Sequence, residues 1–460
     1  DISESKLEST SSSIGTKAGQ AGSVTLSGEG IVFVNSDVAT TISSLKPNNP
    51  TDIAASITIA ANGGNLAITN STVKGSTSGN SDAGDINLST DQTAALIESE
   101  VSSKSTGDGA AGSVNLTAKD INFVDSLFNV ETASTIAGSK AAEIKLQSTG
   151  GSITLTDTGS ITSTINTLSA ASFGIASAST PTETGLVART TGAAEAGSIF
   201  VGAVNGADVD LTIDGLSISS NTQGAGDAGS INLSGQALAV SNNSNISSAA
   251  TQSGDAGSIT ITADQLIVQD SNVSTQANQS GGGDVILTAS DQMNFKTSEI
   301  TASSNGGILS NGGNVSLESP LIISSDTRFL AQANEGNGGQ INVTAETFLK
   351  DTNSTLDASS SGGGIDGEVG VDAVNSEDSI QTTQAEPAYV NVSGMLSQRC
   401  HVQSLDESSS FVVASDTATA NIPGNYQLSQ VRSMDTDLTA NDSANAIMLA
   451  SIGFGVGCYN

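Results

Sequence analysis

Short phrases in which aliphatic and polar residues alternate recur along the chain. "GDAGSINLSG" at 226–235 returns as "GDAGSITITA" at 254–263, and ten further phrases follow the same rule. Each phrase has a small anchor residue, followed two and four positions later by aliphatic residues. The anchors are Gly22, Ala55, Gly84, Gly112, Ala142, Gly197, Gly229, Gly257, Gly283, Gly313, Gly339 and Gly367. Because alternate residues of a strand share a face, the two aliphatic side chains of each phrase point the same way.

All twenty-four of these aliphatic positions hold Val, Ile or Leu, and we expect them to form the core ladder of the fold. They are Val24, Leu26, Ile57, Ile59, Ile86, Leu88, Val114, Leu116, Ile144, Leu146, Ile199, Val201, Ile231, Leu233, Ile259, Ile261, Val285, Leu287, Val315, Leu317, Ile341, Val343, Val369 and Val371. A helical period does not produce this pattern.

The repeat at 257–282 predicts three short strands, near 259–262, 266–269 and 272–275, separated by polar corners. Each strand would stack on its equivalent in the next repeat, which encloses the aliphatic columns. The predicted fold class is therefore all-β: a parallel β-helix, or β-solenoid, of about twelve coils with three short strands each. At about 4.8 Å per coil, such a rod is about 60 Å long.

The spacing of the anchors indicates the domain organisation. Ten of the eleven intervals are 26 to 33 residues, whereas Ala142 and Gly197 are 55 residues apart. The extra length, at about 168–196, is interpreted as an insertion of one period or as a degenerate coil. We assign residues 1–374 to the solenoid. The glycine spacing lapses after residue 375, so 375–460 is interpreted as a C-terminal capping or assembly segment.

The corners between strands offer candidate chemistry. The ten glycine anchors are expected where a sharp corner requires a positive φ. An acid or amide often stands two residues before the anchor, as in Asp227 and Asp255. One interpretation is a column of calcium ligands, because Ca²⁺ takes six to eight oxygen atoms. Asx-turns, in which the side chain bonds its own backbone, explain the column more simply, so we expect no cofactor.

The charge of the chain restricts its partners. There are 47 Asp and Glu against 14 Lys and Arg, which gives a formal net charge of −33. Nucleic acids and anionic membranes bind proteins through Lys and Arg, so neither is an expected partner. The apolar run at 444–457 is too short to cross a bilayer as a helix, which needs about 20 residues.

Both cysteines, Cys400 and Cys458, lie in the C-terminal segment. A zinc site would need about four ligands, and His401 is the only histidine. A disulfide is the better prediction, and it would place the protein outside the reducing cytosol. If it forms, it closes a long loop and stabilises the fold by about 4 kcal/mol in the chain-entropy model.

The coils, together with "LSQRCHVQ" at 396–403 and "SSSFVV" at 408–413, resemble filamentous-haemagglutinin-like exoproteins of the two-partner secretion type, especially the cyanobacterial ones. The resemblance implies a right-handed parallel β-helix, export from a Gram-negative-type bacterium through an outer-membrane partner, and an adhesive or surface-structural role. The N-terminal secretion motifs of that family are not found here, which favours a processed product of a longer precursor.

We therefore expect an extracellular structural or adhesive protein rather than an enzyme. The first residues parallel a third strand, so an open coil there could stack on the end of another copy and build a filament. Two alternatives stay open. A monomeric adhesin would bind glycans or host cells through the 168–196 insertion, and a polysaccharide lyase or hydrolase would need a cleft. The candidate residues of such an enzyme cleft are Arg328, Asp326, Glu299 and Asp351. A surface ion pair formed by Arg328 is the simpler interpretation of these residues.

Overall fold

The computed structural model describes residues 1–13, 21–44, 55–136, 142–159 and 183–377. These residues form parallel strands and contain no helix. They belong to a compact unit of residues 1–383, whereas the second unit, 384–460, lies outside the described residues together with Cys400, His401 and Cys458. The predicted disulfide and C-terminal segment therefore stay predictions.

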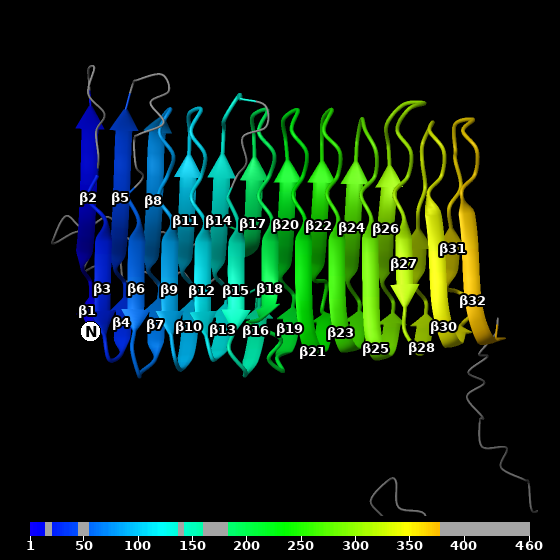
Figure 1. Ribbon diagram of the computed structural model, residues 1–460, viewed down its shortest axis with the longest axis horizontal. Coiled ribbons are helices and arrows are strands. Elements are labelled where there is room, and N and C mark those ends of the chain that lie inside the picture. The colour runs from blue at the N-terminus through cyan, green and yellow to red at the C-terminus, as the bar shows by residue number, and fades with distance from the viewer. Residues whose placement is uncertain (14–20, 45–54, 137–141, 160–182, 378–460) are drawn as a thin grey trace, which may run out of the picture. The chain divides into compact units, whose positions relative to one another are not determined.

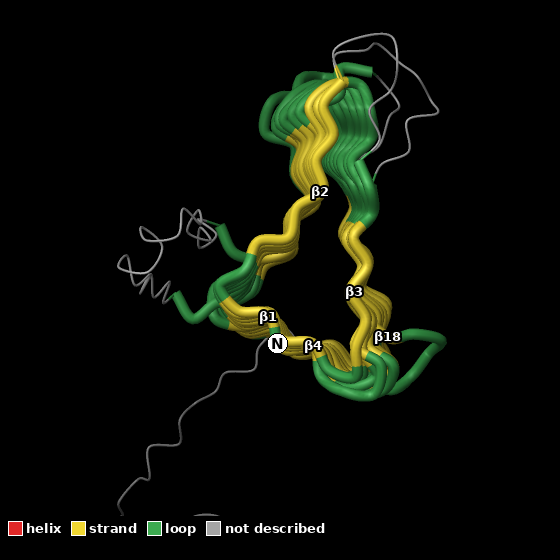
Figure 2. The backbone as a smooth tube through the Cα atoms, turned by 90° about the vertical axis from the view of Figure 1, so that its left-hand side faces the viewer, coloured by secondary structure: helices red, strands yellow, loops and turns green. Residues whose placement is uncertain are grey.

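The described unit is a triangular solenoid, as predicted. Figure 1 shows the coils stacked side by side along one axis, and Figure 2 looks along that axis into the triangle. Seen from the N-terminal end, the chain runs clockwise from β3 to β4 and recedes with each coil, so the solenoid is right-handed. Each coil supplies a first, a second and a third strand, one for each side of the triangle.

The first-strand column begins with the anchor phrases. Its members are β3 (Val24–Gly28), β6 (Ile57–Ala61), β9 (Ile86–Thr90), β12 (Val114–Ala118), β15 (Ile144–Ser148), β18 (Ile199–Ala203) and β27 (Val315–Glu318). In five coils the first and second strands run together: β21 (Ile231–Ser241), β23 (Ile259–Gln269), β25 (Val285–Lys296), β30 (Gln340–Lys350) and β32 (Glu368–Glu377). In the repeat at 257–282, the first two predicted strands are thus one strand, β23, whose pairing with β25 shifts between Ala263 and Gln265.

The second and third columns complete the triangle. The separate second strands are β1 (Ile2–Ser3), β4 (Ile31–Val34), β7 (Leu66–Thr69), β10 (Thr93–Ile97), β13 (Asp120–Val124), β16 (Ser152–Thr156), β19 (Asp210–Asp214) and β28 (Leu321–Ser325). The third strands form a 12-stranded sheet. They are β2 (Lys6–Ser13), β5 (Asp37–Ser44), β8 (Thr72–Gly79), β11 (Glu100–Ser105), β14 (Leu127–Thr132), β17 (Gly185–Thr190), β20 (Ser217–Thr222), β22 (Asn245–Ala250), β24 (Asn272–Ala277), β26 (Glu299–Ser304), β29 (Arg328–Leu330) and β31 (Thr355–Asp357).

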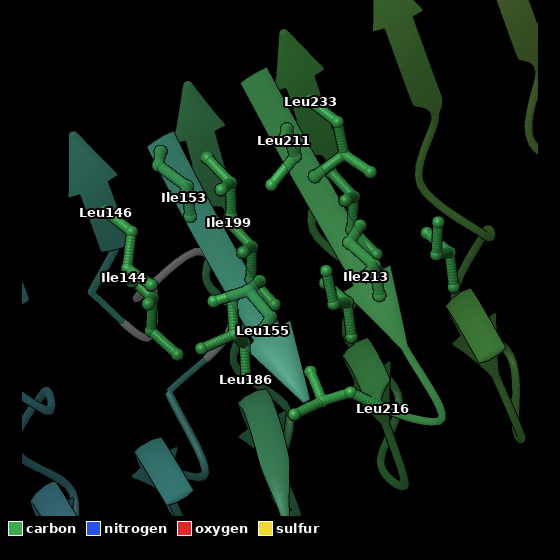
Figure 3. Packing of buried hydrophobic residues seen from close by; sticks show 14 of the residues in the cluster. Ile144, Leu146, Ile153, Leu155, Leu186, Ile199, Leu211, Ile213, Leu216 and Leu233 are labelled. Carbon is green, nitrogen blue, oxygen red and sulfur yellow. The ribbon is translucent and has the colours of Figure 1, made fainter. Parts of the chain in front are cut away.

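The ladder has the predicted register in every coil. Val24 pairs with Ile57, Ile57 with Ile86, and the series continues through Ile341 to Val369. Most of the ladder is fully buried, and Figure 3 shows ladder residues such as Ile144, Leu146 and Ile199 among neighbouring core side chains. Fully burying such a side chain contributes about 1.5–3 kcal/mol.

Three ladder residues depart from the expected burial. Leu26 in the first complete coil is only partly buried, and Val369 and Val371 on β32 are each 43% exposed. The reason is the same at both ends, because an inward side chain is covered only when a further coil stacks on it. Among the described residues, β32 pairs with β30 on one side and with no strand on the other.

The long interval between Ala142 and Gly197 is a single coil. β15 pairs directly with β18, β16 with β19, and β14 with β17, so no degenerate coil intervenes. The expected insertion range of 168–196 is too far along the chain, because 185–190 form the regular third strand β17. The extra length lies between β16 and β17, and its residues 160–182 are outside the described part.

The predicted reason for the glycine anchors is wrong. None of the ten anchors has a positive φ, although other glycines such as Gly185 and Gly215 do. Instead, a Cβ atom on Gly257 would collide with the carbonyl oxygen of Gly229 in the preceding coil. The same clash, with the anchor one coil earlier, is found for Gly84, Gly112, Gly229, Gly283, Gly313, Gly339 and Gly367. Close stacking of successive coils, rather than a left-handed corner, excludes a side chain here.

Hydroxyl groups of the third strand reinforce this stacking. Ser248 Oγ donates a hydrogen bond to the carbonyl of Gly229 (2.9 Å) and accepts one from the Gly257 N–H (2.9 Å). Ser220 makes the same two bonds to Gly197 and Gly229 one coil earlier. Each buried serine therefore joins two consecutive anchors and satisfies polar groups inside the core.

Candidate functional site

The corner between the second and third strands is where left-handed residues gather. Positive φ angles occur there in most coils, for example at Asn35 (48°), Asn70 (45°) and Asp270 (48°). Asn and Asp tolerate this region better than most residues, because their short polar side chains bond locally. The positive φ angles that were expected at the anchors therefore occur between the second and third strands, and mostly at residues other than glycine.

A buried serine follows the left-handed residue and links the coils. Ser99 Oγ accepts a hydrogen bond from the Ser71 N–H (3.2 Å) and donates one to the Ile97 carbonyl (2.8 Å). Ser126 repeats both bonds one coil later, to the Ser99 N–H (3.0 Å) and the Val124 carbonyl (2.8 Å). This serine column was not among the residues predicted from the sequence. Its signal is an acid or amide followed by serine directly after a strand, as in "NS" at 35–36 and 70–71 or "DS" at 125–126 and 270–271.

Over four coils this corner is hollowed into a shallow furrow of about 450 Å³. One wall consists of the residues that bend the chain: Asn243, Asp270, Thr297 and Asp326. The other wall consists of the first residues of the third strands: Asn245, Asn272, Glu299 and Arg328. The buried serines 244, 271 and 298 lie between the walls as a floor.

The polar groups of the furrow are partly interlocked. Arg328 forms an ion pair with Glu299, and their side chains are 62% and 31% exposed. Glu299 Oε1 also accepts a hydrogen bond from Thr301 (3.1 Å), and Asn272 donates one to Asn245 Oδ1 (3.2 Å). By contrast, Asn272 Oδ1 is buried and has no hydrogen-bond partner among the described residues.

Asp351 does not join Arg328 in a cleft. Its carboxylate accepts hydrogen bonds from Ser354 Oγ (2.6 Å), from Ser325 Oγ (3.0 Å) and from the N–H of Asp326 (3.0 Å). Burial alone would raise the pKa of Asp351, but these hydrogen bonds outweigh it and hold the pKa below its ordinary value. Asp351 thus holds the corner at Asp326 in place. The interpretation of Arg328 and Glu299 as a surface ion pair is confirmed.

The column of acids and amides before the anchors connects coils rather than closing Asx-turns. Asp227 accepts a hydrogen bond from the Asp255 N–H (2.9 Å), and Asp255 accepts one from the Gly281 N–H (3.0 Å). Asn311 and Asn337 continue the pattern with N–H groups of the next coil. Within the described ranges, no three His, Cys, Asp or Glu side chains come together in a group that could hold a metal ion.

Two further observations bear on the predicted partners. In the part of the chain that the structure describes, there is no helix with the length and apolar character needed to span a membrane. The resemblance to filamentous-haemagglutinin-like exoproteins stays a prediction. Comparison with protein-family models, with curated proteins and with solved structures gives no match for this chain.

Proposed function

We propose that this protein is an extracellular structural protein, a stiff rod whose copies join end to end into a surface filament. The observation that carries the proposal is the unbroken parallel register of the ladder from Val24 to Val371. In a repeat protein each coil contacts only its neighbours, so an uninterrupted series extends the same interface along the whole rod. A β-solenoid of this kind is consistent with a structural or adhesive repeat protein.

The last described strand supports end-to-end joining. Besides Val369 and Val371, Val374 on β32 is 84% exposed and Ile365 just before it is 76% exposed. An unpaired strand edge beside exposed aliphatic side chains is a template for another strand. A contact of this type between different ends is heterologous, and it propagates into a fibre when it does not close.

The extracellular location and the outer-membrane secretion partner rest on the resemblance and on the cysteine pair. A disulfide between Cys400 and Cys458 would fit an oxidising compartment. Mass spectrometry of the unreduced protein tests that pairing, and two free thiols in material purified from outside the cell would contradict it.

Electron microscopy of the full chain at rising concentration tests the assembly. We expect rods whose lengths are multiples of about 60 Å, the length of one solenoid. The variant Val369→Lys/Val371→Lys places two charges at the exposed end and should leave single rods, because burying unpaired charges is costly. The matched control Asn342→Lys/Thr344→Lys, on the outer face of β30, should still assemble. Single rods of the unmodified chain at every concentration would overturn the proposal.

A further inference from the structure

We infer that the furrow along the corner of the second and third strands is a binding site for a linear, uncharged polysaccharide that lies parallel to the rod axis. This inference concerns the flank of the solenoid and goes beyond end-to-end assembly. It rests on the geometry, the charge and the hydrogen-bonding groups of the furrow residues.

The furrow repeats with the coils. Each of four consecutive coils contributes side chains to it, and equivalent residues are separated by one coil, about 4.8 Å. A ligand that fits along such a site needs a repeat of similar length. An extended chain of β-1,4-linked sugars advances by about one coil spacing per ring. Because its successive rings face opposite ways, equivalent hydroxyl groups recur at every second coil.

The walls carry the groups that bind sugar hydroxyls. Asn243, Asn245 and Asn272 supply amides, which both donate and accept hydrogen bonds, while Asp270 and Asp326 supply acceptors. Asn272 Oδ1 lacks a donor among the described residues, and such an orphaned acceptor costs free energy. Because that oxygen is buried, a ligand in the furrow would meet the other amide and carboxylate groups of the walls.

The charge of the furrow selects against acidic polymers. Its walls hold three carboxylates, on Asp270, Glu299 and Asp326, but only one guanidinium, on Arg328. Arg328 is already paired with Glu299, so it cannot compensate the other two carboxylates. Uronate, sulfate and phosphate groups would therefore be repelled, in keeping with the net charge of −33.

The furrow is also held in place before any ligand arrives. The serines of its floor are buried, and the Asn272 to Asn245 and Thr301 to Glu299 hydrogen bonds connect its wall residues to neighbouring side chains. A preorganised site loses less conformational entropy on binding than a mobile one. In the coil that precedes the furrow, Gly215 takes the place of a wall side chain, so the wall ends there.

Isothermal titration calorimetry of the full chain with β-linked glucan and mannan oligosaccharides of increasing length tests the site. We expect affinity to increase with length up to about four rings, one for each coil of the furrow, and then to level off. Polygalacturonate and heparin should bind at least about tenfold more weakly than an uncharged chain of equal length. Tighter binding of either acidic polymer, or no binding of any uncharged one, would overturn the inference.

Matched variants locate the binding. Asn245→Ala/Asn272→Ala removes amides from the furrow and should weaken binding at least about tenfold. Asp37→Ala/Thr72→Ala changes the equivalent first positions of β5 and β8, outside the furrow, and should leave affinity unchanged. The single variant Asn272→Ala gives a milder test if the double variant does not fold, which circular dichroism shows. Equal losses in the furrow and control variants would contradict the assignment.

Two additional readouts separate this inference from other functions. New reducing or unsaturated ends in the titrated sugar would indicate cleavage and would overturn a role limited to binding. Rod lengths in electron micrographs should be the same for Asn245→Ala/Asn272→Ala and the unmodified chain. A failure of filament assembly therefore leaves the furrow result standing, and the reverse also holds.

Discussion

At the scale of single residues, close approach between coils decides which side chains are allowed. Eight of the ten anchor glycines are small because the carbonyl of the preceding anchor occupies the position of a Cβ atom. The left-handed corner accepts Asn and Asp because a short polar side chain tolerates positive φ, and its buried serines satisfy backbone groups of two coils. Both features serve the contact between neighbouring coils.

Gly257→Ala should therefore destabilise the solenoid by about 1–3 kcal/mol, the usual cost of overpacking. Its new methyl group would collide with the backbone at Gly229. Gly22→Ala is the matched control, since the nearest atom to a Cβ there, Ser9 Oγ, is 3.4 Å away. Urea unfolding followed by circular dichroism compares the two. Equal stabilities of both variants would mean that coil stacking does not restrict the anchors.

The carboxyl of Asp351 should make stability depend on pH. Its pKa is lowered in the folded protein: burial raises it, but hydrogen bonds from Ser354, Asp326 and Ser325 prevail. Its contribution is then fully present above the unfolded value, about 3.9, and is lost as the pH falls through the lower folded value. The difference in free energy of unfolding between the unmodified chain and Asp351→Asn should shrink below about pH 4. A difference that grows with acidification would give the opposite sign and contradict the hydrogen-bonding account.

At the scale of strands, the outer face of the third-strand sheet is buried at some residues and exposed at others. Leu186 and Ala188 belong to the core, so the intervening Val187 lies on the outer face of β17. Val187 is nevertheless 0% exposed, and Leu127 on β14 is 6% exposed without belonging to the core cluster. In the same column, Ser247 on β22 is partly exposed.

Val187→Asp should thus cost several kcal/mol, because it would bury an unpaired carboxylate. Ser247 occupies the equivalent position two coils later, because Val187 pairs with Ser219 and Ser219 with Ser247. Ser247→Asp should change stability by less than about 1 kcal/mol. Thermal unfolding of both variants measures the contrast. Equal midpoints would show that the outer face of β17 is as open to water as that of β22.

The strands are also where prediction from the sequence succeeds and where it stops. Pairs of aliphatic residues such as Ile259 and Ile261 recur in twelve phrases. Their spacing of two places both side chains on the same face of the strand, so the ladder and its register could be predicted. The reason why residue 257 is a glycine could not be predicted, because it depends on the distance to the backbone of another coil. The furrow could be predicted only in part: the sequence pointed to Glu299, Asp326 and Arg328 as cleft candidates, and these three do line it. Asn245 and Asn272 were missed because they are about one repeat apart, and only stacking brings them together.

At the scale of the whole described unit, the solenoid is a series of similar interfaces. Two aromatic pairs lie in its interior, with ring centroids 5.3 Å apart for Phe123 and Phe128 and 5.2 Å apart for Phe295 and Phe329. Each pair adds about 0.5–1.5 kcal/mol beyond its buried area. The aliphatic ladder that separates these pairs is continuous, and both the end-to-end assembly and the furrow depend on its stacked coils in parallel register.

Pulsed electron-electron spin resonance between labels on the first-strand column measures that register most directly. Thr58 and Asn342 occupy the same outward column, nine coils apart by successive pairing from β6 to β30. With Cys400 and Cys458 replaced by Ser, labels at Thr58→Cys and Asn342→Cys should be separated by about 43 Å, and labels at Thr58→Cys and Thr260→Cys, six coils apart, by about 29 Å. Distances that do not increase in proportion to the number of coils would contradict the stacked solenoid.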